Sequence, residues 1–193
     1  MIVDTMSYSE IREYLFNNMP DEGKVMNFFY KNLRRSVLKA PNKYIFNTMY
    51  SPTINGVTYY VIYEKLSKKD FGAALFAKFF YKGHIRIVSL SKHNKTIQWY
   101  SAHYRERVVE RSSNNDYSLK TFFKTMIPLM KDVTDIHNIY QGNTGYIQNG
   151  YFHVVDTSNL YVVIYKTIIP LNRENYINKQ LIKSHLGELS FKS

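Results

Sequence analysis

Three side chains that can bind a phosphodiester recur at helical spacing in the middle of the chain. Residues 96–111 begin as a β-rich segment and change to a helical pattern at Ser101. On that predicted helix His103, Arg107 and Arg111 are four residues apart and share one face. Imidazole is an acid or a base near neutral pH, and guanidinium groups hold phosphate oxygens. The pattern is therefore typical of phosphodiester binding, with cleavage as a further step.

The same helix also fits a charged, solvent-facing helix that has no function. Glu106 and Glu110 lie next to the basic residues, and Arg107 is three residues before Glu110. Such intrahelical pairs contribute about 0.2–0.5 kcal/mol each and imply no chemistry. The sequence leaves both interpretations open.

A resemblance favours catalysis. Tyr-Ser-Ala-His-Tyr-Arg-Glu-Arg-Val-Val-Glu-Arg, at 100–111, resembles the Ser/Thr-x-His-Ala-x-x-Arg-x-x-x-Arg segment of small RelE/BrnT-like toxin-fold proteins of bacteria and phages. The resemblance covers residues 99–169, and Tyr104 stands where those proteins have Ala. It implies a metal-independent ribonuclease that needs no cofactor. His103 would move protons, Arg107 and Arg111 would stabilise the charged transition state, and Lys166 or Tyr165 would assist.

The overall charge favours a polyanion as partner. The formal net charge is +11 and the pI is near 9.6, with a balance of +8 over residues 1–100 and +3 over the remainder. We expect RNA or single-stranded nucleic acid to bind Arg34, Arg35 and Arg105 and to stack on Trp99. Two alternatives remain: a nucleic-acid-binding module without catalysis, and a phage or mobile-element protein that meets an acidic protein partner. The charge at Arg34 and Arg35 also complements the end of a helix dipole.

Several classes of function are excluded by composition. The chain has no cysteine, so it has neither disulfides nor cysteine-based zinc sites. The six histidines are scattered, and no spacing predicts a metal site or a cofactor loop. No apolar run is long enough to span a bilayer, and the N-terminus lacks a secretory pattern. We therefore expect a cytoplasmic protein without a membrane segment.

The hydrophobic periodicity predicts a single α+β domain built on an antiparallel sheet. Period-two patterning over 43–100 predicts a five-stranded meander, and two more strands are expected at 146–155 and 160–169. Helical patterns surround these strands. The expected helices are two N-terminal ones within 8–38 (8–19 and 21–38), a central pair within 102–131, and a C-terminal helix at 172–186.

Overall fold

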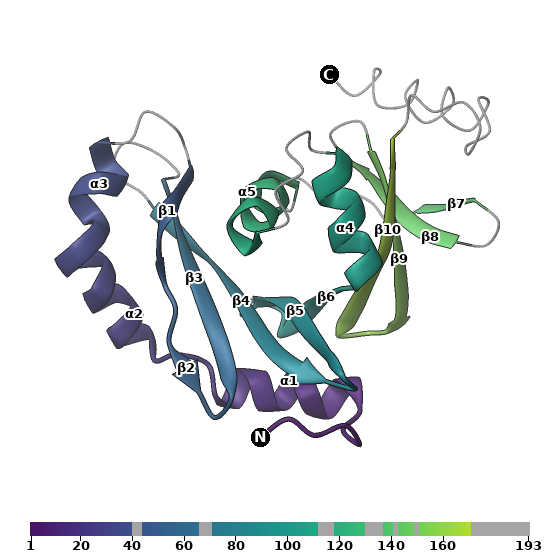
Figure 1. The fold of residues 1–193 in the computed structure, drawn as a ribbon, viewed down its shortest axis with the longest axis horizontal. Coiled ribbons are helices and arrows are strands. Elements are labelled where there is room, and N and C mark those ends of the chain that lie inside the picture. Colours follow the sequence, from purple (N-terminus) through teal and green to yellow (C-terminus); the bar gives the residue numbers. More distant parts are fainter. Residues whose placement is uncertain are drawn as a thin grey trace.

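The computed structural model describes residues 1–39, 44–65, 71–111, 118–129, 137–140, 143–148 and 151–170. In these residues the fold is α+β, with one ten-stranded sheet that carries helices on both faces (Figure 1). This confirms the predicted class.

The first helix begins at a capping box. α1 (Tyr8–Asn17) is preceded by Ser7, whose Oγ accepts a hydrogen bond from the backbone N–H of Glu10. The Glu10 carboxylate in turn accepts from the N–H of Ser7 at 2.7 Å. Both bonds satisfy amides that a helix start leaves without partners. Ile11 and Leu15 face inward and are buried.

The second predicted helix is continuous but contains a π turn. It consists of α2 (Glu22–Phe28), the π turn η1 (Phe29–Leu33) and α3 (Arg34–Lys39). Phe29, Leu33 and Val37 are buried, and the outer positions between them are left to polar and basic side chains.

The predicted meander is confirmed. Its strands are antiparallel neighbours in the order β1, β3, β4, β5, β6, and the short β2 pairs with β3. Glycines at positive φ, Gly56 and Gly83, allow two of the tight turns. The strands are β1 (Tyr44–Tyr50), β2 (Thr53–Ile54), β3 (Val57–Lys65), β4 (Phe71–Tyr81), β5 (His84–Ser91) and β6 (Thr96–Tyr100).

The second half of the sheet corrects two predictions. β10 (Val162–Pro170) lies parallel to β6, so the sheet is mixed rather than antiparallel throughout. The order then continues through β9 (Tyr151–Asn159), β8 (Asn143–Gln148) and β7 (His137–Tyr140), all antiparallel. The single strand predicted at 146–155 is wrong, because that range contains parts of two strands, β8 and β9, which pair with each other antiparallel.

The central helical pair is confirmed and covers one face of the sheet. α4 (Ala102–Arg111) follows β6 directly, and α5 (Leu119–Leu129) packs beside it (Figure 1). The C-terminal helix predicted at 172–186 lies outside the described residues, as do 112–117 and 130–136.

Three hydrophobic clusters lie on the two faces of the described sheet. The α4 cluster packs Tyr104 and Phe122 against Phe76 and Tyr165. On the opposite face, the α1 cluster packs Ile11 and Leu15 against Trp99. The α2 cluster packs Phe29, Leu33 and Val37 against Val61 and Tyr63. Along β3, Val61 and Tyr63 face α2 whereas Ile62 faces α4 and α5, as strand alternation requires.

The single-domain organisation stays a prediction, although one sheet runs through both halves of the described chain. None of the helices that the structure describes is long and apolar enough to cross a membrane.

Candidate nucleic-acid interface

Ser101 fixes the start of α4 against the sheet. Its N–H donates to the carbonyl oxygen of Tyr165 at 3.1 Å, and its hydroxyl donates to that of Lys166 at 3.1 Å. The same hydroxyl accepts from the N–H of Tyr104 at 3.0 Å, which is an N-cap bond. The start of α4 is thus tied to β10, the strand that carries two of the predicted catalytic residues.

His103 lies on the exposed side of α4, in its first turn. Within the described part of the chain it makes no hydrogen bond to another side chain. Nothing there orients the imidazole toward a reacting atom, as a general base requires.

Arg107 is paired within its own helix. Its Nη1 lies 2.6 Å from the Glu110 carboxylate, and both side chains are about 40% exposed (42% and 40%). This is the intrahelical pair that the alternative interpretation expected. Its charge is largely neutralised locally.

Arg111 lies at the end of α4, where its carbonyl oxygen accepts a hydrogen bond from the Tyr151 hydroxyl at 3.2 Å. The residue is half-buried. It therefore connects α4 to β9 and is not presented on an open surface in the way that His103 is.

Tyr165 does not lie where a catalytic role would need it, which corrects the prediction. The side chain is 1% exposed, and its ring centroid lies 5.1 Å from those of Tyr100 and Tyr104. The residue is part of the α4 cluster. Lys166, the next residue, was the other one predicted to assist catalysis. Adjacent side chains of a strand point to opposite faces of the sheet.

Lys166 lies on the other side of the sheet from α4. Its ammonium is 3.1 Å from the carboxylate of Asp156. Asp156 is the cross-strand partner of Ile164, which packs in the α1 cluster. Hydrogen bonds from Ser158, together with Lys166, lower the pKa of Asp156 to about 2. Lys166 and His103 therefore lie on opposite sides of the sheet in this structure.

Trp99 is buried, which corrects its assignment as a stacking residue. The side chain is 3% exposed. Its ring meets the rings of Tyr8, Phe79 and Tyr81 edge to face, with centroids 4.9–5.8 Å apart. No base reaches this ring without opening the α1 cluster.

A buried polar pair in the α4 cluster was not predicted from the sequence. His153 is fully buried, and its Nδ1 lies 2.8 Å from the Tyr104 hydroxyl. Burial raises the pKa of Tyr104 well above its usual value. Only the pairing of β9 beneath α4 brings these residues together, so no sequence spacing signals them.

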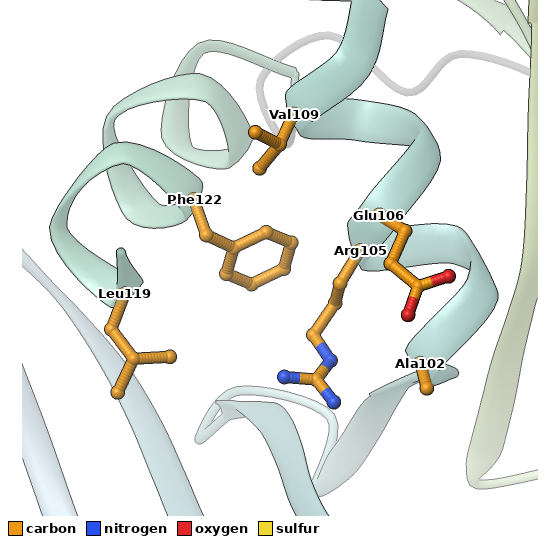
Figure 2. A pocket seen from close by; sticks show the side chains of 6 residues that line it. All are labelled: Ala102, Arg105, Glu106, Val109, Leu119 and Phe122. Atoms are coloured by element: carbon orange, nitrogen blue, oxygen red, sulfur yellow. The ribbon is translucent and has the colours of Figure 1, made fainter. Parts of the chain in front are cut away.

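Arg105 faces a pocket of about 200 Å³ between α4 and α5. Figure 2 shows its guanidinium aimed into the space bounded by Leu119 and Phe122. The Nη2 donates to the carbonyl oxygen of Ile85 at 3.4 Å, and the buried Nε has no hydrogen-bond partner among the described residues. Burial lowers the pKa of Arg105, and the carboxylate of Glu106, which also lines the pocket, opposes that shift.

Arg34 and Arg35 lie on an exposed face of the second helix. We call Tyr30, Lys31, Arg34, Arg35 and Lys39 the basic helix face. All five are exposed, and the Arg34 guanidinium lies over the Tyr30 ring at 5.8 Å from its centroid. No acidic side chain of the described residues forms an ion pair with this face.

The positive charge of the chain is concentrated in one segment. Residues 23–105 contain 15 Lys/Arg and 2 Asp/Glu, whereas the rest of the chain contains 11 and 13. The balance is +13 for the segment and −2 for the remainder. The segment forms the basic helix face, the meander and the beginning of α4.

Among the described residues, no group of three or more His, Asp or Glu side chains is placed to hold a metal ion.

The geometry defines a mixed-sheet α+β protein with a strongly basic N-terminal half. No family model matches the chain, and neither a curated protein nor a solved structure matches it.

Proposed function

We propose that this protein binds nucleic acid and holds the phosphate backbone on the basic helix face. The observation that carries the proposal is the presence of four exposed cationic side chains on one helix with no acidic partner in the described residues. Lys31, Arg34, Arg35 and Lys39 contribute the charge. Unpaired cations release condensed counterions when they meet phosphates, and this release supplies most of non-specific affinity.

The geometry of the face suits phosphate better than it suits a simple solvated surface. The Arg34 guanidinium lies over the Tyr30 ring, 5.8 Å from its centroid, which is within the range of a cation–π contact. Tyr30 itself is 53% exposed and offers a ring edge beside the cations. The π turn that carries both Tyr30 and Lys31 is a feature that often occurs at functional sites.

Complementing the helix dipole explains only part of the charge. Cations in the last turn of a helix are stabilising, which accounts for Lys39 and partly for Arg35. It does not account for the absence of any Asp or Glu between residues 23 and 63, a stretch with six Lys/Arg. A helix selected only for solubility carries mixed charges.

The ribonuclease hypothesis has weaker support. A metal-independent cleavage needs an acid or base and phosphate-binding groups within hydrogen-bond reach of one site. His103 is exposed, Tyr165 is buried, and Lys166 lies on the opposite face of the sheet. We therefore propose binding and leave cleavage to a direct test.

The first prediction is a steep dependence of nucleic-acid affinity on salt. Fluorescence anisotropy with a labelled oligonucleotide measures the slope of log K against log salt. Replacing Arg34 and Arg35 by Gln should weaken binding to every sequence and reduce that slope by about 2, or about 1 per lost phosphate contact.

The matched control removes the same charge elsewhere. Arg107→Gln with Lys166→Gln also removes two positive charges, but both of these already face a carboxylate. We expect this control to keep nearly the wild-type slope. Absence of binding at low salt contradicts the proposed function, and equal losses in the two double variants contradict its assignment to the basic helix face.

A further inference from the structure

Two large apolar side chains stand exposed on the sheet beside α4. Phe80 and Ile85 are cross-strand partners on β4 and β5, and they are 63% and 54% exposed. On the same face Phe76 and Ile87 are buried in the α4 cluster. β6 ends opposite Ile87, two residues short of Ile85. The exposed pair thus continues the apolar face beyond the described part of α4 and α5.

The surroundings of this pair are basic. Lys78 lies on the same face of β4, two residues before Phe80, and its ammonium is 5.9 Å from the centroid of the Tyr60 ring. Residues 71–105 contain six Lys/Arg and no Asp or Glu. An exposed ring in a positive field fits a ligand that has both flat apolar faces and negative charge. Nucleic acid has both, whereas an acidic peptide has mainly the charge.

Arg105 connects the exposed pair to the pocket. Its Nη2 lies 3.4 Å from the carbonyl oxygen of Ile85, so the guanidinium contacts the backbone of one member of the pair. Its buried Nε has no acceptor among the described residues. Figure 2 shows the guanidinium at the pocket, where its terminal nitrogens can donate to a phosphate oxygen.

The pocket is not a site for a bare anion. Glu106 lines it together with Arg105, as Figure 2 shows. A carboxylate repels phosphate alone, but it accepts hydrogen bonds from the amino groups of a base. Leu119 and Phe122 form an apolar wall of the pocket, and an apolar wall packs against the ring of a base better than it packs against water.

We propose that Phe80, Ile85, Lys78 and Arg105 form a binding site for an unpaired nucleotide of a single-stranded nucleic acid. The base stacks on Phe80, and Arg105 and Lys78 hold the adjacent phosphates. The inference rests on the proposed function and names its substrate form. In a duplex the faces of the bases are covered by their neighbours, so the site discriminates against paired strands.

The experiment compares two ring substitutions on two forms of ligand. Labelled single strands of about 12 nucleotides, oligo(U) and oligo(dT), are titrated beside a hairpin duplex, a length within the footprint of a single-strand site. Phe80→Ala should weaken single-strand binding about tenfold and leave duplex binding unchanged. Phe80→Tyr keeps the ring and should bind like the wild type. The ring is exposed, so the thermal transition should not move.

A second variant tests the phosphate contact. Arg105→Gln should reduce the salt slope for the single strand by about 1, which a merely structural role would not do. An unchanged slope would overturn the assignment of Arg105. A larger loss with oligo(U) than with oligo(dT) would identify RNA as the preferred form of the same ligand.

Other outcomes separate this inference from the proposed function. If the wild type binds the single strand and Phe80→Ala binds it equally well, the site is overturned while the basic helix face stands. Equal losses for single strand and duplex also overturn it. Competition by poly-glutamate that disappears in Phe80→Ala would make an acidic protein the occupant instead. A wild type that binds neither ligand removes both proposals.

Discussion

The helices on the two faces of the sheet carry similar numbers of cations and use them differently. On one face Lys31, Arg34, Arg35 and Lys39 point to solvent without an acidic partner in the described chain. On the other face α4 carries Arg107, which pairs with Glu110, and Arg105, which is turned inward toward Ile85. The sequence pattern of α4 looked more like a site, yet the second helix presents four exposed cations without an acidic partner in the described residues.

The difference shows that a count of basic residues is not a measure of a binding surface. A cation paired with a carboxylate at 2.6 Å gives little net field at the distance of an approaching phosphate. Spacing alone cannot distinguish the two cases, because Glu106 and Glu110 fit equally well beside a site and within a solvated helix. What matters is which charges remain after pairing and burial.

The largest expected effect concerns the packed side of the comparison. Tyr165→Ala should lower the free energy of unfolding by about 3–5 kcal/mol, as large-to-small changes of core aromatic residues do. The reason is the loss of ring contacts with Tyr100 and Tyr104 at 5.1 Å. Urea denaturation measures this loss. The adjacent exposed Lys166→Ala is the control and should cost no more than about 1 kcal/mol.

Equal free energies of unfolding for Tyr165→Ala and Lys166→Ala would contradict the contrast between the packed and the exposed side chain. Tyr165 would then be dispensable for packing, and the α4 side of the sheet would again be open to a functional role.

Much of the fold was predictable because local signals agreed with one another. The meander follows from alternation and from turn residues such as Asn55-Gly56 and Lys82-Gly83. The parallel pairing of β6 with β10 was not predictable in the same way. It joins residues more than 60 positions apart, and no local pattern specifies which edge a returning strand takes. The π turn, which carries Phe29 against Tyr63 of β3, was not predicted either.

The exposure of the candidate site residues was predictable from the sequence only where a local helical pattern shows which side is buried. Arg34 and Arg35 are exposed, because the helical stripe of Phe29, Leu33 and Val37 fixes which side is buried, and their role in binding stays a prediction. The stacking role predicted for Trp99 does not fit its burial, because the α1 cluster covers the face of β6 that carries its ring. Phe80 was missed for the opposite reason. The residues next to Phe80, Phe79 and Tyr81, favour a strand, so the sequence gives no sign that its ring is exposed. The ring is left uncovered because β6 ends opposite Ile87, before it reaches this part of the sheet.

A smaller effect is expected at Asp156, whose carboxylate pairs with Lys166, and it measures how much a paired charge stabilises the fold. Asp156 has a folded-state pKa of about 2, below its ordinary value of 3.8, mainly because Ser158 donates hydrogen bonds and also because of Lys166. A lowered pKa means that the contribution to stability is complete above about pH 4 and is lost as the pH falls through about 2. Asp156→Asn should therefore cost up to about 1 kcal/mol at pH 7, a value typical of a largely solvated pair.

Urea denaturation at several pH values measures this difference. The stabilities of the wild type and Asp156→Asn should converge as the pH is lowered from 4 toward 2. A difference that stays constant over this range would show that the carboxylate charge is not what stabilises the strand pair.

The smallest expected effect is at His103, and it decides between binding and cleavage. The side chain is exposed on α4 and contacts no hydrogen-bonding partner in the described residues. His103→Ala should therefore change the free energy of unfolding by less than about 0.5 kcal/mol, as exposed substitutions usually do. It should also leave the affinity for nucleic acid unchanged, because the basic helix face lies on the other side of the sheet and His103 is not among the residues proposed to hold the unpaired nucleotide. Incubation of the wild type and the variant with a mixed-sequence RNA pool, with and without EDTA, should leave the RNA intact in all four cases.

Cleavage by the wild type that falls about 10²–10⁴-fold in His103→Ala would instead identify His103 as an acid or base. In that case the α4 face would be the active surface, with the phosphate held by groups that rearrange when RNA binds.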